Sequence, residues 1–536
     1  MTSRIILTGT VALLLSSCTY QPIAKQTGSE GPSVEPAVAE ASVSEPTRPK
    51  NVILMISDGI GFNGWLAADY YQGLAGKQSY QVTRPDGTKP YVYGLAHSAL
   101  NLVDENGEVL PRGSDVADAS GAVEQGYDPT TRWTKFENSM ANDFSPIGRS
   151  YTSYTDSAAA GTALMSGRKT SVGRINVDWT GKQSFVTIAE VAMKQGLSAG
   201  SVASVMVSHA TPASVIAHNI SRNNYKDIFN EMVASKLDVI MGAGHPLYGN
   251  NGKMVESANA QNYQYVGGEE TYAMMQETSG LNGFDYIDAK ADFEALAVGA
   301  DVPERVVGIA RAGNTLQAAR GGLDTADTPS GMAFNETVPD LATMSRGALN
   351  VLSQDEDGFF VMIEGGAVDW MGHANNMPRF IEEQIDFNLA VDEVIAWVEE
   401  NSSWEDTLLI ITSDHECGGI WGEGTWTNSV GGAVAEDRSA DALETARFDP
   451  AEDEFNDFLA VQDRGEGNIP GYQWASPNHT NELVPLWAIG AGAGRFAEFT
   501  RSDLKAGKLW GEAYGWNGQY VDNTAVFDVM NALINQ

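Results

Sequence analysis

Short runs of apolar residues, each closed by a polar residue or a glycine, recur along most of the chain. They are Val52–Ile56, Val202–Val207, Val239–Met241, Phe359–Ile363, Leu408–Ile411 and Leu486–Ile489. Continuous apolar runs of this length are typical of strands that are buried on both faces, as in a parallel sheet.

Helix-like stretches lie between these runs. They include Ser184–Gln195, Pro212–Ile220 and Arg379–Glu400, and Asn523–Asn535 closes the chain as a terminal helix. Strands that alternate with helices predict an α/β fold, here a three-layer sandwich with a mostly parallel central sheet. Three segments lack this alternation, and we expect them to be large insertions on one domain of residues 51–536: about 84–148, 246–345 and 421–475.

Polar residues follow the predicted strands with unusual regularity. They are Asp58, His209, Glu364 and the pair Asp414-His415. In parallel sheets ligands bind beyond the carboxyl ends of the strands, and packing alone does not require polar residues there. A shared site at one edge of the sheet is therefore the expected cause.

The composition limits the classes of molecule that the protein is expected to bind. The 536 residues include 43% apolar and 19% charged positions, as in a globular protein, and the formal net charge is −37. A strongly negative surface repels nucleic acids and anionic membranes, so neither is an expected partner.

The N-terminus has the pattern of an export signal. Arg4 precedes an apolar run that ends at Leu15-Ser16-Ser17-Cys18, which is too short to span a bilayer as a mature helix. Leu15–Cys18 resembles a bacterial lipoprotein box, so residues 1–18 are predicted to be a lipoprotein-type signal with Cys18 lipidated, which places the protein in the periplasm or cell envelope. The alternative is an ordinary cleaved signal with an incidental cysteine. Residues 19–50 are rich in Pro, Ser, Glu, Ala and Thr and are predicted to form a flexible linker.

Cysteine usage excludes an intramolecular disulfide if Cys18 is acylated. Cys417 is the other of the two cysteines. Stability must then come from packing and from bound metals.

Asp156-Ser157 stands directly before an alanine-rich stretch, Ala158–Ala163. Asp is favoured at the start of a helix and Ala within it. A helix that begins here would hold Ser157 in its first turn, where free N–H groups stabilise an alkoxide or a phosphate. The alternative is a simple cap on a buried helix.

Carboxylate and imidazole side chains, the types that bind metal ions, are concentrated in the second half of the chain. Asp369 and His373 stand four residues apart, so one helical turn would place both on the same face, beside Glu364. Asp414-His415 and His479 supply further oxygen and nitrogen groups. Carboxylates with imidazoles favour zinc, whereas an oxygen-only set favours magnesium.

The order and local spacing of these motifs resemble those of alkaline phosphatases, in particular the bacterial, marine-type branch with large insert loops. The motifs span residues 51 to about 492, and they are Ile56-Ser57-Asp58-Gly59, Asp156-Ser157-Ala158-Ala159, His209-Ala210-Thr211-Pro212, Arg222, Glu364 to His373, Asp414-His415 and His479-Thr480.

The resemblance implies a fold, a reaction and a set of residues. Ser157 would be the nucleophile of phosphate monoester hydrolysis, forming a phosphoserine that water cleaves to release inorganic phosphate. Arg222 would clamp two phosphate oxygens, and Asp156 would orient Arg222. The metal sites would hold two Zn²⁺ and one Mg²⁺: Asp369, His373 and His479 for the first zinc, Asp58, Asp414 and His415 for the second, and Asp58, Thr211 and Glu364 for magnesium. A homodimer is also expected by resemblance.

Three positions beside the expected metals depart from the pattern of some relatives. His209 stands where some carry Asp near the third metal, and Trp370 where some carry Lys. Cys417, two residues after His415, could tune the zinc shell or be an inert buried thiol. His218 and His245 are interpreted as structural histidines.

Other functions remain open at this point. A phosphodiesterase of the same superfamily would keep the zinc ligands but lack the third-metal set and the arginine clamp, and Thr211, Glu364 and Arg222 argue against it. A sulfatase would need a Cys-x-Pro-x-Arg type motif, which is absent. A metal-binding surface lipoprotein would not need an intact nucleophile.

Overall fold

The computed structural model describes residues 48–110, 114–130, 154–277, 280–322, 324–325, 327–425 and 458–536. All of them belong to one compact unit, Pro46–Gln536. The expected signal segment 1–18 and nearly all of the linker 19–50 lie outside the described residues, as do residues 111–113 and 131–148 of the segment 84–148 and most of 421–475.

Eleven strands of the described chain form one central sheet in the order β16-β17-β2-β15-β10-β1-β9-β5-β6-β8-β7. Their bounds are β1 Asn51–Ser57, β2 Tyr91–Ala96, β5 Ser198–Met206, β6 Val239–Ala243, β7 Asp285–Ile287, β8 Val306–Ile309, β9 Phe359–Gly365, β10 Thr407–Thr412, β15 Val484–Gly490, β16 Arg501–Ser502 and β17 Gln519–Asp522. Three two-stranded ribbons pair β3 Leu100–Val103 with β4 Gly121–Glu124, β11 Glu416–Cys417 with β14 His479–Thr480, and β12 Ile420–Trp421 with β13 Gln473–Trp474.

The helices of the described residues are α1 Phe62–Gln72, α2 Ser157–Ser166, α3 Ile188–Lys194, α4 Ala210–Ala213, α5 Tyr225–Ala234, α6 Glu269–Met275, α7 Lys290–Ala297, α8 Leu341–Leu352, α9 Ala367–His373, α10 Met377–Asn401, α12 Leu504–Tyr514 and α13 Thr524–Ile534. Short 3₁₀ turns are η1 Val116–Asp118, η2 Asn262–Val266 and η3 Ala493–Phe499.

The sheet is mostly parallel, as the apolar runs predicted. β1 pairs in parallel with β10 on one side and β9 on the other, and β5 continues the parallel order beyond β9. The strand β15, which contains the run Leu486–Ile489, runs the other way and pairs antiparallel to β10. An apolar run reports that a strand is buried, not which way it points. The antiparallel direction matters for the site, because it brings the start of β15, just after His479, to the edge where β1 and β10 end.

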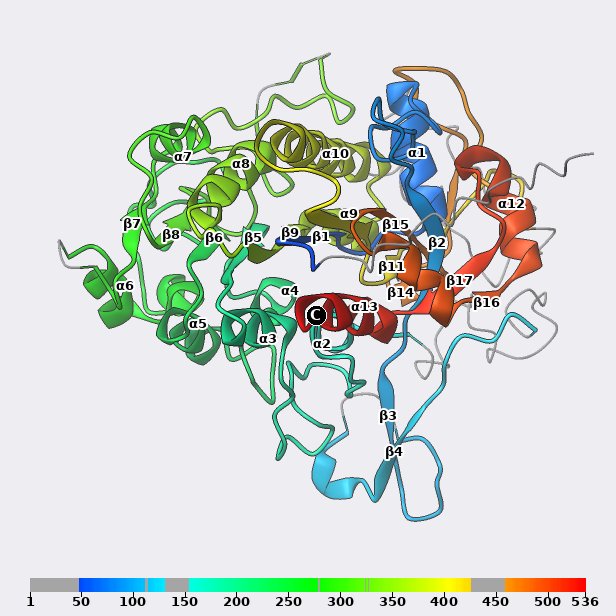
Figure 1. The fold of residues 1–536 in the computed structure, drawn as a ribbon, viewed down its shortest axis with the longest axis horizontal. Helices are drawn as coiled ribbons and strands as arrows, with labels where there is room; N and C mark the ends of the chain where they lie inside the picture. The colour runs from blue at the N-terminus through cyan, green and yellow to red at the C-terminus, as the bar shows by residue number, and fades with distance from the viewer. Residues whose placement is uncertain are drawn as a thin grey trace, which may run out of the picture. The chain divides into compact units, whose positions relative to one another are not determined.

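Helices cover both faces of the sheet, which makes the expected three-layer sandwich. In Figure 1, α8 and α10 lie on one side of the sheet and α2, α3 and α13 on the other. Successive residues of β1 alternate between the two cores: Ile53 and Met55 pack with the first group, and Val52 and Leu54 with the second. This alternation follows from the period of two along a strand.

Two of the three segments expected to be insertions also build the sheet. β2 lies within 84–148 and pairs with β15 and β17, while β7 and β8 lie within 246–345 and extend the sheet beyond β6. The expectation is corrected for these stretches. β7 and β8 are only 3 and 4 residues long, which is too short for a recognisable apolar run.

The predicted helices are found with shifted ends. α10 spans the expected Arg379–Glu400, and α3 begins one residue after Thr187, which forms a capping box with Glu190. Pro212–Ile220 is helical only in its first residues, within α4. Asn219 donates from its backbone N–H to the carbonyl of Ile175 at 2.9 Å, and this bridge draws the chain out of the helix.

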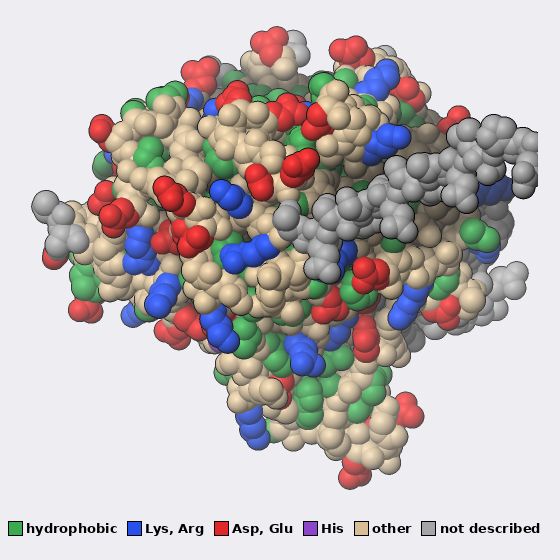
Figure 2. Space-filling model, viewed as in Figure 1, with side chains coloured by type: hydrophobic (Ala, Val, Ile, Leu, Met, Phe, Trp, Pro, Cys, Tyr) green, Lys and Arg blue, Asp and Glu red, His purple; other side chains and the backbone are tan. Residues whose placement is uncertain are grey.

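Acidic and basic side chains are interspersed on the face drawn in Figure 2. Among the described residues, no helix combines the length and the apolar character that crossing a membrane requires.

Gly59 offers a test of how tightly this fold is built at the end of β1. Its φ is +74°, and a Cβ there would stand 2.6 Å from the Cβ of Asp369. Because Gly59→Ala combines backbone strain with a clash, we expect it to lower the free energy of unfolding by about 2–4 kcal/mol. Gly87→Ala is the matched control, since Gly87 also has a positive φ of +95° but nothing within 4 Å. Chemical denaturation of both variants checks this, and an equal effect would contradict the packing argument.

Candidate active site

Four neighbouring strands, β10, β1, β9 and β5, bring polar residues to the same edge of the sheet. Asp58 follows β1, Glu364 lies near the end of β9, and Asp414 follows β10. The parallel register places Glu364 beside Ile56, two residues before Asp58. The sequence prediction of one shared edge is thus confirmed in its geometry.

Ser157 is the first residue of α2, as its position before the alanine run predicted. Asp156 caps the helix by accepting a hydrogen bond from the N–H of Ala159 at 3.1 Å. Ser157 is buried, and its Oγ lies 3.3 Å from Nε2 of His415. The helix N-terminus thus presents a hydroxyl to a histidine that comes from the far end of the chain.

Arg222 points into this site and is held by Asp156. Its Nη1 donates to Oδ2 of Asp156 at 2.9 Å, and the same oxygen accepts from the N–H of Gly173 at 3.0 Å. Its Nη2 lies 3.3 Å from Nε2 of His209, whose ring stands edge-on to Trp370 at 5.9 Å. The carboxylate of Asp156 therefore both caps α2, which begins with Ser157, and anchors Arg222.

Asp369, His373 and His479 form the first metal-type group. Nε2 of His479 lies 3.2 Å from Oδ1 of Asp369 and 3.1 Å from Nε2 of His373. Nδ1 of His479 is 2.8 Å from the carbonyl of Thr155, and Nδ1 of His373 is 2.5 Å from that of Pro477. A carbonyl can only accept, so each Nδ1 carries the proton and each Nε2 offers a lone pair toward Asp369.

Asp58, Asp414 and His415 form the second group. Nε2 of His415 lies 3.3 Å from Oδ2 of Asp414 and 3.5 Å from Oδ1 of Asp58. Oδ1 of Asp414 accepts from the N–H groups of Gly59 and of His415, which fixes the carboxylate. The three side chains are completely buried.

The third group expected from the sequence, Asp58, Thr211 and Glu364, is also brought together. Carboxylate oxygens of Asp58 and Glu364 lie with a ring nitrogen of His209 within 4.8 Å of one another. Neither oxygen of Glu364 nor the hydroxyl of Thr211 has a hydrogen bond of ordinary geometry among the described residues. His209 therefore lies beside the oxygen ligands expected for the third metal.

The carboxylates of these groups lack the partners that buried charges require. Burial raises the pKa of Asp58 well above its usual value, and the charges of Asp414 and Asp369 raise it further. Burial, with repulsion from Asp414, raises the pKa of Glu364 to about 8, and burial raises that of Asp414 to about 6. Buried anions this close together need a counter-charge, and divalent cations supply it. The donor sets therefore fit metal ions: oxygen and imidazole nitrogen for zinc, mainly oxygen for magnesium.

Burial and neighbouring charges also shift the pKa values of two histidines and of Asp369. Burial lowers the pKa of His415 far below its usual value, and burial with the charge of Arg222 lowers that of His209 to about 3. For Asp369, burial raises the pKa, but His373 and His479 outweigh it, so the net shift is downward. His209 and His415 are consequently neutral at physiological pH, as a metal ligand must be.

Sequence reasoning missed the groups that act through the backbone. The carbonyls of Thr155 and Pro477 orient the two histidines, and the N–H of Gly173 supports Asp156. No side-chain pattern marks a backbone group, so these contacts needed coordinates. His97, whose ring stands 6.4 Å from that of His415, was also missed.

The remaining histidines have partners away from this edge. His218 is held by Glu231 and the carbonyl of Phe185, as a structural histidine would be. His245 is buried and lies 3.1 Å from Asp288 and 3.2 Å from the hydroxyl of Tyr272.

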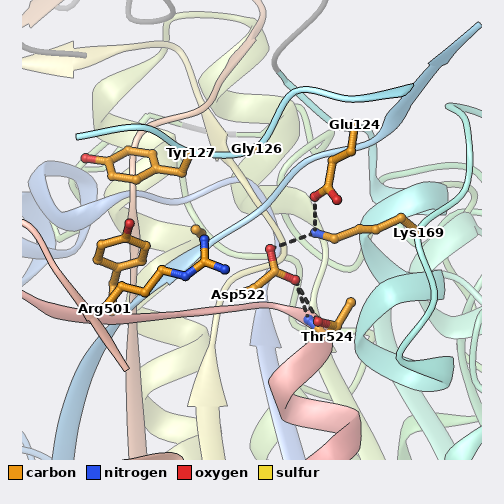
Figure 3. Close-up of a pocket in the computed structure, with 9 residues that line it drawn as sticks. Glu124, Gly126, Tyr127, Lys169, Arg501, Asp522 and Thr524 are labelled. Atoms are coloured by element: carbon orange, nitrogen blue, oxygen red, sulfur yellow. Dashed lines mark hydrogen bonds and ion pairs between the residues drawn. The ribbon is translucent and has the colours of Figure 1, made fainter. Parts of the chain in front are cut away.

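A polar cavity of about 330 Å³ beside β2 and β17 is separate from these groups (Figure 3). Lys169 points into it and bonds Asp522 at 3.0 Å, with Glu124 at 3.6 Å. Arg501 also lines the cavity, so its two cations are matched by two acids. This balance leaves no excess positive charge for an anionic substrate.

The fold and the site together define an α/β enzyme that carries a buried serine between clusters of metal-type side chains. The alkaline phosphatase family model matches residues 136–501. Alkaline phosphatase 4 of Bacillus subtilis is 28% identical over 377 residues, covering 64% of this chain and 73% of that protein. The alkaline phosphatase of Escherichia coli is 25% identical over 457 residues, covering 76% of this chain and 82% of that protein.

Solved structures agree on the fold. The alkaline phosphatase of the Antarctic bacterium TAB5 matches with a TM-score of 0.52 at 19% identity, covering 92% of this chain and 99% of that one. The cold-active alkaline phosphatase of Shewanella sp. matches with a TM-score of 0.52 at 20% identity, over 91% of this chain and 100% of that one. The chain belongs to the alkaline phosphatase family and is a phosphatase.

The raised carboxylate pKa values predict a pH-dependent stability of the metal-free protein. Glu364 has a pKa of about 8 when folded and about 4.5 when unfolded, so the folded chain binds the extra proton between these values. Its contribution to stability is therefore lost as the pH rises toward 8. His209 and His415, whose pKa values are lowered, act in the opposite direction, but only below about pH 6.5.

We therefore expect the chelator-treated protein to lose about 2 kcal/mol of folding stability between about pH 6.5 and 8.5. The metal-loaded protein should change much less, because bound cations remove the repulsion. Thermal unfolding across this pH range checks it, with Glu364→Gln expected to flatten the metal-free profile. Identical pH profiles with and without metal would contradict the argument.

Proposed function

We propose that the chain is a metal-dependent alkaline phosphatase that hydrolyses phosphate monoesters through a phosphoserine at Ser157. The observation that carries the proposal is the position of Ser157. Its hydroxyl lies at the N-terminus of α2, 3.3 Å from Nε2 of His415, in a site that also contains Arg222. Phosphoryl transfer needs mainly positioning and charge stabilisation, which this arrangement offers.

Arg222 is suited to hold the phosphate. Its planar guanidinium can bond two oxygens of a phosphate face, which a lysine ammonium cannot do in the same way. Asp156 already fixes its orientation through an ion pair at 2.9 Å, and four-fifths of the Arg222 side chain is shielded from solvent. The N–H groups at the start of α2 add a positive partial charge on the same side.

The metal ligands proposed here are those of the three groups. Asp369, His373 and His479 would hold one zinc, Asp58, Asp414 and His415 a second, and Asp58, Thr211 and Glu364 a magnesium ion. When bound, the two zinc ions supply Lewis-acid stabilisation of the entering and leaving oxygens. A variant of the TAB5 enzyme binds Mg in its M3 site, which supports a third site in this fold.

The charges of the site favour an anionic substrate. Three dications outweigh the four ligand carboxylates Asp58, Glu364, Asp369 and Asp414, and Arg222 adds one more positive charge. The pocket is then positive inside a protein with a net charge of −37. A monoester dianion is drawn to such a pocket.

The reaction proceeds in two displacements. Ser157 Oγ attacks phosphorus while the ester oxygen leaves and takes up a proton as the alcohol. Water then attacks the phosphoserine, inorganic phosphate leaves, and Ser157 regains its proton. Arg222 holds the same two phosphate oxygens in both steps, so the phosphoryl group stays in place while its partners exchange.

The cellular setting is proposed from the sequence alone. We propose that the chain is exported and held in the cell envelope by a lipid on Cys18, because Leu15–Cys18 resembles a lipoprotein box. A homodimer is proposed from the family resemblance.

Ser157→Ala tests the nucleophile. We expect turnover of p-nitrophenyl phosphate to fall by several orders of magnitude, as when a nucleophile is removed, while the circular dichroism spectrum and bound metal stay unchanged. Ser166→Ala, in the last turn of the same helix, is the matched control and should keep nearly full activity. Unchanged turnover in Ser157→Ala would overturn the proposed mechanism.

Arg222→Lys tests monoester recognition. A lysine keeps the charge but loses the bidentate contact, so kcat/KM for p-nitrophenyl phosphate should drop by about 10²-fold or more. Bis(p-nitrophenyl) phosphate, a diester with fewer free oxygens, should be affected less. Arg346→Lys is the control, because Arg346 of α8 pairs with Glu393 of α10 at 2.9 Å and belongs to none of the three groups. Faster diester than monoester turnover in the wild type would favour a phosphodiesterase instead.

A further inference from the structure

The side chain of Cys417 lies among the first metal-type group. Its Sγ, a carboxylate oxygen of Asp369 and ring nitrogens of His373 and His479 all lie within 4.8 Å of one another. Cys417 is completely buried and is not in a disulfide. The thiol is therefore a fourth potential donor beside the three ligands that the family resemblance implied.

Backbone contacts fix the thiol in this place. Cys417 pairs antiparallel with His479 across the ribbon of β11 and β14, so the two side chains share one face. Its N–H donates to the carbonyl of Gly59 at 3.0 Å. On the other side, a Cβ on Gly372 of α9 would stand 3.1 Å from Cβ and 3.2 Å from Sγ of Cys417. α9 can approach this closely only because residue 372 is glycine, and α9 carries both Asp369 and His373.

The groups around Sγ are typical of a metal site and not of a cysteine packed in a hydrophobic core. Buried cysteines usually pack as small hydrophobic residues. Here the neighbours are a carboxylate and two imidazoles, and the carbonyls of Thr155 and Pro477 turn both Nε2 atoms inward. Oδ1 of Asp369 has no hydrogen bond of ordinary geometry among the described residues. Donors around a tetrahedral zinc stand about 3.3–3.6 Å apart, so donor atoms that lie within 4.8 Å of one another need to close by about 1.5 Å at most.

We propose that Cys417 is a direct ligand of the metal ion held by Asp369, His373 and His479. The inference rests on the proposed function for the presence of that ion. On binding, the thiol proton passes to solvent and a sulfur–metal bond forms, with no change of oxidation state. The resulting oxygen–nitrogen–nitrogen–sulfur set selects zinc, cobalt or cadmium over magnesium, because thiolate is a soft ligand.

Cobalt substitution tests the proposal. We expect the Co²⁺-loaded wild type to show an intense thiolate-to-cobalt absorption band in the near ultraviolet. The band should be lost in Cys417→Ser and kept in Cys18→Ser, which removes the only other cysteine. A wild-type protein that binds Co²⁺ without this band would overturn the proposal whether or not the variants fold.

Zinc affinity and proton release supply a second readout. Cys417→Ser should weaken zinc binding at this site by about 10-fold or more. Near pH 7 the wild type should release one proton more per bound zinc than Cys417→Ser does. Equal affinity and equal proton release would contradict ligation by Cys417. If the wild type binds no zinc and still hydrolyses monoesters, the proposed function itself fails. Zinc-dependent hydrolysis without the cobalt band rejects only the role of Cys417.

Discussion

The main physical constraint on this structure is the repulsion among carboxylates that the fold buries at one edge of its sheet. Asp58, Glu364 and Asp414 are fully buried, and Asp369 nearly so. Both oxygens of Asp58 and Glu364, and one oxygen each of Asp369 and Asp414, lack an ordinary hydrogen-bond partner among the described residues. Burying one unpaired charge costs several kcal/mol, so this cluster would destabilise the chain without compensation. The direction of the pKa shifts of Asp58 and Glu364 expresses that cost. Bound divalent cations would offset this cost, and under the proposed function the same ions take part in the reaction.

The scaffold meets this constraint with rigid elements. Three of the acids follow or end adjacent strands, and the fourth lies on α9 directly after one. His373 and His479 are fixed through their Nδ1 atoms, and Ser157 is held at the capped start of α2. Asp156 links two tasks, since it starts the helix of Ser157 and anchors Arg222. Loops alone would not hold groups from positions 58 to 479 at such spacing.

Much of this arrangement could be predicted from the sequence, for physical reasons that differ by residue. Asp58, Glu364 and Asp414 were predictable because strand ends in a parallel sheet meet at one edge, and Asp369 with His373 because of the helical spacing. The direction of β15 and the short strands β7 and β8 were not, because neither leaves a distinct pattern. The carbonyls of Thr155 and Pro477 carry no sequence signal at all. The sequence showed that Cys417 departs from the pattern of relatives near His415. Its pairing with His479 and its contact with Gly372, which needed coordinates, locate its sulfur beside the first metal-type group.

Anomalous X-ray diffraction at the zinc absorption edge, on crystals of the zinc-loaded protein, tests the central claim most directly. We expect two strong peaks, one among Asp369, His373 and His479 and one among Asp58, Asp414 and His415, with Ser157 Oγ beside the second. Peaks confined to the protein surface, or no peak at this edge of the sheet in a catalytically active crystal, would contradict it.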